Sequence, residues 1–109
     1  MTPTLNVIVL YAKDMQKTAQ FYQQYFGFVS TGQVVEGLID LKSPYGGASL
    51  LIHQAAKSVK LGQAGVKLMF DVEDIDGFKK KSAALGLEFG STHVANGYSF
   101  ANAKDPDKN

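Results

Sequence analysis

The spacing of the apolar residues changes at Asp14. Before it, residues 6–12 are rich in β-branched and aromatic side chains, which predicts a strand with two apolar faces, both of them covered. After it, apolar side chains recur at helical intervals until Gly27. An aspartate can accept hydrogen bonds from the first amides of a helix, and a glycine can end a helix in the left-handed conformation, so we expect a helix between them. The residues of its apolar stripe are Met15, Thr18, Ala19, Phe21, Tyr22, Tyr25 and Phe26.

Shorter patterns follow this helix. Residues 28–33, 38–42 and 48–53 are typical of strands, and the latter two alternate cleanly. The intervening run 43–47 contains an early proline and two late glycines, which predicts a turn. Residues 54–65 are small, polar and basic without a clear period, and we interpret them as a linker.

The second half of the chain repeats the order of the first. Residues 66–72 alternate like a strand, and Asp74 then occupies a cap position before a narrow helical stripe. Residues 8–15 align without a gap with residues 68–75. An internal repeat of this kind predicts that one structural module occurs twice.

A hairpin is predicted near the end of the second half. Residues 87–95 and 98–103 flank Asn96-Gly97, the strongest short hairpin signal in the chain. We therefore predict one α+β domain over 1–109, built from paired βαβββ modules. Its expected parts are module one at about 5–53, a linker at about 54–65 and module two at about 66–109.

Composition excludes several kinds of function. The formal net charge is +1, and the 11 basic and 10 acidic residues form no basic stripe, so we expect binding to neither nucleic acid nor membranes. The absence of cysteine excludes disulfides, thiolate metal sites and a cysteine nucleophile. Because there is no signal pattern and no apolar run of about 20 residues, we predict a cytoplasmic protein.

Several features occur together in this chain. They are the paired βαβββ modules, an aspartate followed by an apolar residue at each first strand–helix corner, an FY pair on the first helix, a following G-F and a late DPD. In these features the chain resembles the vicinal oxygen chelate superfamily, which includes glyoxalases, bleomycin resistance proteins, fosfomycin-modifying enzymes and extradiol dioxygenases. The resemblance implies a curled mixed sheet that forms a concave cup for a metal or ligand, helices on the outer face, and often a homodimer.

The resemblance also implies where a metal would be held. The family's ligand positions fall on Val7, Leu51 and Lys67, and the fourth lies on a strand after a DPDGN turn, whereas this sequence reaches only Asn109. Hydrocarbon side chains have no lone pair, and a protonated lysine repels a cation. We therefore predict that this protein has no metal and no other cofactor, and that the last strand of module two is missing.

Strand alternation predicts which side chains line the cup. Its walls would be Val7, Val9, Tyr11, Leu38, Asp40, Leu51 and His53 from module one, and Lys67, Met69, Asp71, Ser91, His93, Phe100 and Asn102 from module two. The candidate ligand-binding residues among them are Tyr11, Asp40, His53, Lys67, Met69, Asp71, His93, Phe100 and Asn102. The alternative is a filled core, in which Lys67 forms an ion pair with Asp40 or Asp71.

Three functions are compatible with this pattern. The leading hypothesis is a metal-free protein that binds a small molecule, as in drug sequestration, since an aromatic wall with a few polar groups is typical of a ligand pocket. The first alternative is a diverged glyoxalase-like or dioxygenase-like enzyme. The second alternative is a structural or regulatory dimer without a pocket.

Overall fold

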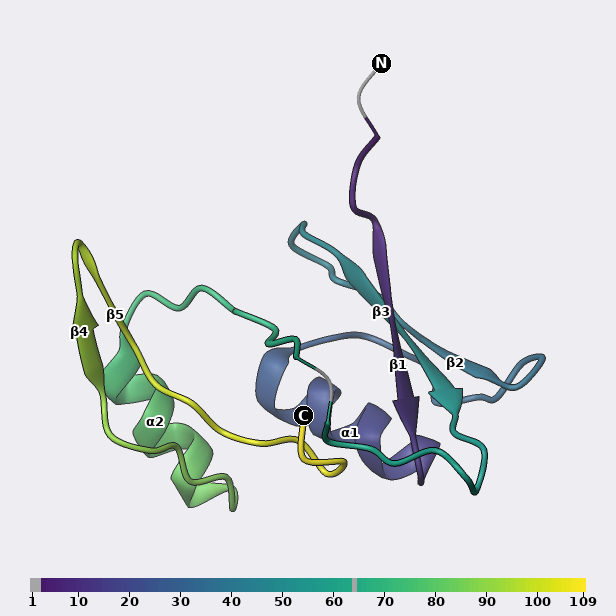
Figure 1. Cartoon of the computed structure of the whole chain (residues 1–109). Helices are drawn as coiled ribbons and strands as arrows, with labels where there is room; N and C mark the ends of the chain where they lie inside the picture. Colours follow the sequence, from purple (N-terminus) through teal and green to yellow (C-terminus); the bar gives the residue numbers. More distant parts are fainter. Residues whose placement is uncertain (1–2, 64) are drawn as a thin grey trace. The chain divides into compact units, whose positions relative to one another are not determined.

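The computed structural model describes residues 3–63 and 65–109, which form two compact units (Figure 1). Unit 1 comprises the described residues up to Val66 together with Asp105–Asn109. Unit 2 is Lys67–Lys104. The five residues at 105–109 therefore pack with the first half of the chain, although they follow unit 2 in sequence.

Unit 1 contains a mixed three-stranded sheet with the order β1-β3-β2. Strand β1 (Val7–Ala12) runs parallel to β3 (Ser49–Gln54), and β2 (Leu38–Leu41) runs antiparallel to β3. Parallel neighbours need a crossover connection, and here helix α1 (Met15–Phe26) and β2 lie between them in sequence. The strands predicted at residues 38–42 and 48–53 are confirmed within one residue at their ends.

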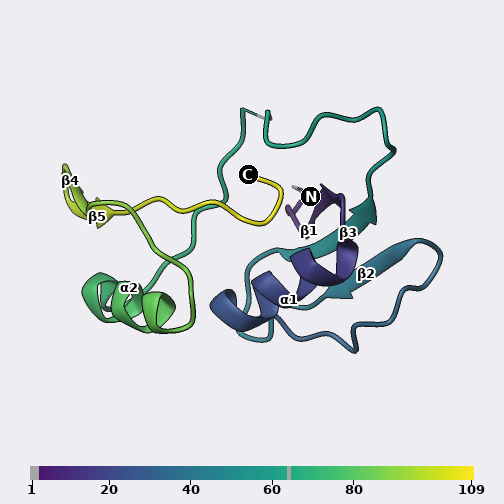
Figure 2. The same ribbon diagram turned by 90° about the horizontal axis from the view of Figure 1, so that it is seen from below.

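Helix α1 lies across one face of this sheet (Figure 1, Figure 2). Its predicted ends are confirmed, since the Asp14 side chain accepts from the amide of Lys17 at 3.1 Å and Gly27 adopts a left-handed φ of 73°. The buried apolar residues between helix and sheet form the core of unit 1. They are Ala12, Ala19, Tyr22, Phe28, Ile39, Leu41, Leu50 and Ile52.

The strand predicted at residues 28–33 is wrong. Only Val29 bridges a neighbour, by two backbone hydrogen bonds with Lys42. Beyond it, the Ser30 hydroxyl accepts from the amide of Gly32, and Gly32 has a φ of 75°. Local side-chain acceptors compete with a strand ladder for backbone amides, and a left-handed residue turns the chain out of the sheet.

Unit 2 contains helix α2 (Ile75–Ala84) and a hairpin of β4 (His93–Ala95) and β5 (Tyr98–Phe100). The hairpin predicted around Asn96-Gly97 is confirmed. The predicted cap is also confirmed, because the Asp74 side chain accepts from the amide of Gly77 at 3.1 Å. Its backbone angles, −129° and 100°, nearly match the −124° and 100° of the cap in unit 1.

The strand predicted at residues 66–72 is absent from the described chain. Alternation alone does not make a strand, because the backbone must also bond to a neighbouring strand, and the described residues 66–72 belong to neither sheet. The strand predicted at residues 87–95 is likewise reduced to β4. The α+β class is confirmed, with two helices and a mixed sheet in the described residues, whereas the curled cup stays a prediction.

Candidate functional site

One face of the unit 1 sheet is covered by α1, and the other carries the side chains predicted to line the cup. The strand register pairs Val9 with Leu51 and Tyr11 with His53, and it pairs Asp40 with Leu51. Paired residues point to the same side of a sheet, so these side chains share one face. We call it the open sheet face, and its residues are Val7, Val9, Tyr11, Leu38, Asp40, Lys42, Ser49, Leu51 and His53.

The open sheet face is less covered than the sequence predicts. Both faces of β1 were expected to be buried, yet the exposed fraction is 46% for Val9 and 50% for Tyr11. In contrast, Ala12, on the helix side of the same strand, is fully buried. Strand β1 therefore presents apolar and aromatic surface to the outside of unit 1.

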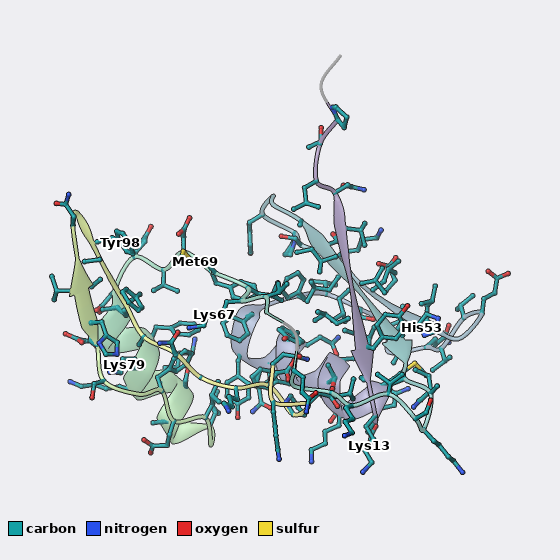
Figure 3. All side chains as sticks on the ribbon, in the orientation of Figure 1. Lys13, His53, Lys67, Met69, Lys79 and Tyr98 are labelled. Carbon is teal, nitrogen blue, oxygen red and sulfur yellow. The ribbon has the colours of Figure 1, made fainter. Side chains whose placement is uncertain are left out.

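An aromatic pair forms one end of the open sheet face. The rings of Tyr11 and His53 lie 4.9 Å apart between centroids and are tilted by 43°. His53 is held by a second contact, since its Nδ1 lies 2.8 Å from the backbone oxygen of Gln54. The side chain of His53 at the end of β3 is labelled in Figure 3.

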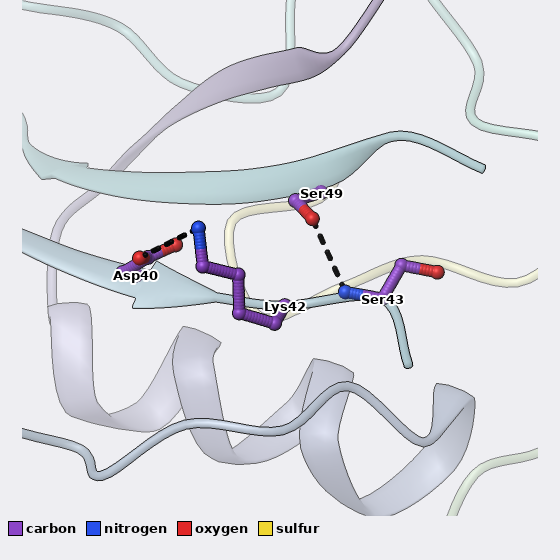
Figure 4. Close-up of polar contacts among 4 residues, drawn as sticks. All are labelled: Asp40, Lys42, Ser43 and Ser49. Carbon is purple, nitrogen blue, oxygen red and sulfur yellow. Dashed lines mark hydrogen bonds and ion pairs between the residues drawn. The ribbon is translucent and has the colours of Figure 1, made fainter. Parts of the chain in front are cut away.

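A polar group lies on the β2 side of the same face (Figure 4). The Lys42 ammonium and the Asp40 carboxylate form an ion pair at 3.1 Å, and both side chains are exposed. The Ser49 hydroxyl accepts from the amide of Ser43 at 3.1 Å. The surface thus changes from aromatic at Tyr11 to ionic at Asp40, whose carboxylate is paired with Lys42.

In unit 2, four of the predicted site residues form two separate pairs. The Lys67 ammonium donates to the side-chain oxygen of Asn102 at 3.5 Å, and both residues are exposed. His93 and Phe100 are paired across the hairpin, with ring centroids 5.3 Å apart. The predicted ion pair of Lys67 with Asp71 is not found among the ion pairs of the described residues.

Met69 and Asp71 lie on the segment that lacks a strand. The exposed fraction of Met69 is 76%, and its side chain is labelled in Figure 3. Alternate side chains share a face only on a pleated strand, so without one these two side chains are not assigned to a common wall. Their roles in ligand binding stay predictions.

The residues at the family's metal positions do not fit a metal ion. Val7 and Leu51 share the open sheet face and offer only hydrocarbon, and Lys67 carries a positive charge. In the part of the chain that the structure describes, no three histidine, aspartate or glutamate side chains gather as ligands. No metal-dependent step is therefore derived from this site.

A cluster that the sequence did not reveal joins residues 105–109 to α1. Tyr22 donates its hydroxyl hydrogen to Asp105 at 2.7 Å, and Thr18 donates to Asp107 at 2.8 Å. The other oxygen of Asp107 accepts from the backbone amide of Lys13 at 3.1 Å. All four side chains of this carboxylate clasp (Thr18, Tyr22, Asp105 and Asp107) are buried. A threonine inside the predicted apolar stripe was the one signal of a buried polar partner.

The carboxylate clasp changes the acidity of its tyrosine. Burial, together with the hydrogen bond to Asp105 and the negative charges of Asp105 and Asp107, raises the pKa of Tyr22 well above its ordinary value. The hydroxyl therefore stays protonated and keeps donating to the carboxylate. This chemistry stabilises the unit and does not suit proton transfer, which needs a pKa near the working pH.

An open hollow of about 540 Å³ lies at the start of α1, away from the open sheet face. Its lining includes charged groups of both signs, namely Lys13, Asp14, Lys17 and Asp107. The carboxylates of Asp14 and Asp107 already accept backbone amides there. Two of the charged groups at the hollow are thus already engaged with the start of the helix. No helix formed by the described residues has the length and apolarity to cross a membrane.

Comparison with known proteins places these features in a family. The family model described as the Glyoxalase/Bleomycin resistance protein/Dioxygenase superfamily matches residues 4–109. None of the curated proteins matches the chain.

Solved structures show the same fold at low identity. TnmS3, an antibiotic binding protein from Streptomyces sp. CB03234, is 17% identical with a TM-score of 0.82, covering 99% of this chain and 91% of TnmS3. A glyoxalase family protein from Enterococcus faecalis is 20% identical with a TM-score of 0.75, covering 96% and 91%. A lactoylglutathione lyase from Agrobacterium tumefaciens is 21% identical with a TM-score of 0.71, covering 100% and 90%.

Proposed function

The chain belongs to the glyoxalase/bleomycin resistance protein/dioxygenase superfamily, and from this premise we propose that it binds a small organic molecule on the open sheet face without a metal. The observation that carries the proposal is the exposed aromatic and apolar surface of β1, with Val9 and Tyr11 about half exposed. Contiguous exposed apolar patches are uncommon on soluble proteins unless they bind something. A flat apolar molecule would cover this surface.

The chemistry of the face supports a ligand with an aromatic part. The tilted rings of Tyr11 and His53 form a platform, on which a planar molecule gains stacking in addition to burial. Hydrocarbon from Val9 and Leu51 continues the platform along the strands. Polar groups lie only at the margin of the platform. This arrangement matches pockets that bind a ligand by apolar contact and orient it through a few polar groups.

Sequestration of a compound is the form of this function that we favour over catalysis. The positions that bind metal in the family's enzymes carry Val7, Leu51 and Lys67. The metal ion that acts as the electrophile in those enzymes therefore finds no ligand at these positions. The fold similarity to an antibiotic binding protein is compatible with this choice. The cup and the homodimer belong to the same proposal, in which a second wall would enclose the ligand.

The experiment that tests this proposal uses a flat probe without a hydrogen-bond donor. Titration of the full chain with 2-methoxynaphthalene, followed by amide NMR shifts, is expected to saturate and to shift resonances of β1 and β3. Tyr11→Ala is expected to weaken binding about twofold to tenfold, which corresponds to the range of about 0.5–1.5 kcal/mol for an aromatic pair.

A matched control distinguishes binding at the proposed site from nonspecific binding. Tyr45 lies in the turn before β3 with an exposed fraction of 99%, and it is the same residue type without a platform. Tyr45→Ala is expected to leave the affinity unchanged. Non-saturating binding, or equal losses in the two variants, would refute the proposed site.

A further inference from the structure

The hydrogen bond of His53 determines which of its ring nitrogens carries hydrogen. Its Nδ1 lies 2.8 Å from the backbone oxygen of Gln54. A carbonyl oxygen can only accept, so Nδ1 must be the N–H donor. In a neutral imidazole the other nitrogen, Nε2, then carries a lone pair and is a hydrogen-bond acceptor.

The surroundings of His53 leave this acceptor available. No hydrogen bond to Nε2 is recorded within residues 3–63 and 65–109, and the His53 ring is only partly buried. The backbone bond and the contact with Tyr11 fix the orientation of the imidazole from two sides. A fixed acceptor therefore stands beside the aromatic platform.

The other polar side chains of the open sheet face either have a partner already or can act as both hydrogen-bond donor and acceptor. Asp40 and Lys42 are paired with each other, and the Ser49 hydroxyl accepts from the amide of Ser43. The Tyr11 hydroxyl can rotate to donate or to accept, so it imposes no preference on a ligand. Apart from the Asp40 carboxylate, which is paired with Lys42 on the β2 side, His53 Nε2 is the side-chain group of this face that accepts and cannot donate.

We propose that His53 Nε2 selects ligands that carry an O–H or N–H donor at the edge of a flat aromatic part, such as phenols, aryl amines and N–H heterocycles. This inference rests on the proposed function and adds the chemical class of the ligand. A donor on the ligand satisfies Nε2 while its ring lies on the platform. A ligand without a donor displaces water from Nε2 and does not replace the lost hydrogen bond, which lowers the affinity.

A pair of probes of nearly equal shape isolates this contact. 2-Naphthol carries a hydroxyl donor, and 2-methoxynaphthalene replaces that hydrogen with a methyl group. The measured quantity is the ratio of their dissociation constants at about pH 8, where an ordinary imidazole is neutral. His53→Phe keeps an aromatic ring and removes the acceptor, so the preference for 2-naphthol is expected to fall about tenfold relative to the unchanged protein.

An exposed tyrosine outside the open sheet face gives the control. Tyr45 has an exposed fraction of 99% and is not among the predicted site residues. Tyr45→Phe is expected to leave the probe ratio unchanged. Nitrogen-15 spectra of the histidines provide a readout that needs no variant: His53 is expected as the Nδ1–H tautomer, and 2-naphthol is expected to shift its Nε2 resonance.

The possible outcomes distinguish the role of His53 from the proposed function itself. An Nε2–H tautomer at His53, or a probe ratio that His53→Phe leaves unchanged, overturns the role of His53 while the proposed function stands. Binding of neither probe refutes the proposed function, and this inference falls with it. A ratio that changes equally in Tyr45→Phe would show that the preference does not come from the open sheet face, and it also overturns the role of His53.

Discussion

Replacing Tyr22 with phenylalanine tests how much the carboxylate clasp stabilises unit 1. The exchange removes one hydroxyl and keeps the ring, which contacts Phe21, Phe26 and Phe28 on the helix and after it. The lost hydrogen bond, from the Tyr22 hydroxyl to Asp105, measures 2.7 Å and is buried. The change in stability therefore reports on this bond and little else.

The expected loss follows from what remains at Asp105. One carboxylate oxygen keeps two backbone donors, the amides of Asp107 at 2.8 Å and Asn109 at 2.9 Å. Among the described residues, the oxygen that faced Tyr22 keeps only the Asn109 side-chain amide, at 3.3 Å. A hydrogen bond to a charged group contributes about 1.5–3 kcal/mol, so we expect the free energy of unfolding to fall by that amount.

Urea unfolding followed by circular dichroism measures the total loss, and amide exchange locates it. The amides of Asp107 and Asn109 donate to Asp105 and should exchange faster in Tyr22→Phe. Tyr45→Phe makes the same chemical change at a fully exposed tyrosine and is expected to alter neither quantity. A loss below about 0.5 kcal/mol in Tyr22→Phe would show that water replaces the bond without cost, and would refute the reasoning.

Four further outcomes are expected. The pKa of Tyr22 is raised above its ordinary value of 10.0, so with rising pH the unfolded chain releases this proton before the folded chain does. The free energy of unfolding should therefore fall above about pH 10 by up to about 1.4 kcal/mol per pH unit. In an alkaline denaturation series, Tyr22→Phe should lack this component. Lys67→Met should change the free energy of unfolding by less than about 0.5 kcal/mol in urea titrations, because Lys67 is exposed and its bond to Asn102 is long at 3.5 Å; a larger loss would mean that the lysine is buried in solution. Elemental analysis of the purified protein should find no stoichiometric transition metal, and about one ion per chain would contradict the absence of ligands at Val7 and Leu51. Sedimentation at micromolar concentration should show a homodimer, since β1 is an edge strand of its sheet, and a monomer alone would count against it.

The features that the sequence predicted correctly are local. Asp14 and Asp74 cap helices because their carboxylates reach amides only three residues away. Asn96-Gly97 specifies a hairpin from within the turn itself, since this pair favours its backbone angles. Such features need no knowledge of the rest of the fold.

The errors concern segments whose partners lie elsewhere. Residues 28–33 and 66–72 have the composition of strands, but a strand forms only where a neighbour accepts its backbone hydrogen bonds. The amides of the first segment bond to its own serine and threonine side chains, and the second segment belongs to neither sheet of the described residues.

The two sites illustrate different limits of sequence reasoning. Alternation placed Tyr11 and His53 on one sheet face, but the protonated nitrogen of His53 depends on a side-chain torsion that no pattern encodes. The bonds of Thr18 and Tyr22 span 89 and 83 residues, and nothing near either residue in sequence indicates an aspartate partner. Long-range polar contacts therefore had to come from the structure.

The carboxylate clasp has a consequence for synthesis on the ribosome. Unit 1 is discontinuous, because Asp105–Asn109 complete it only after all of Lys67–Lys104 has been translated. At about 5–20 residues per second, the first sheet and α1 wait several seconds with the hydroxyls of Thr18 and Tyr22 still lacking their carboxylates. A nascent chain paused in that interval would expose the helix surface that the clasp later covers, and would be the form that chaperones and proteases meet first.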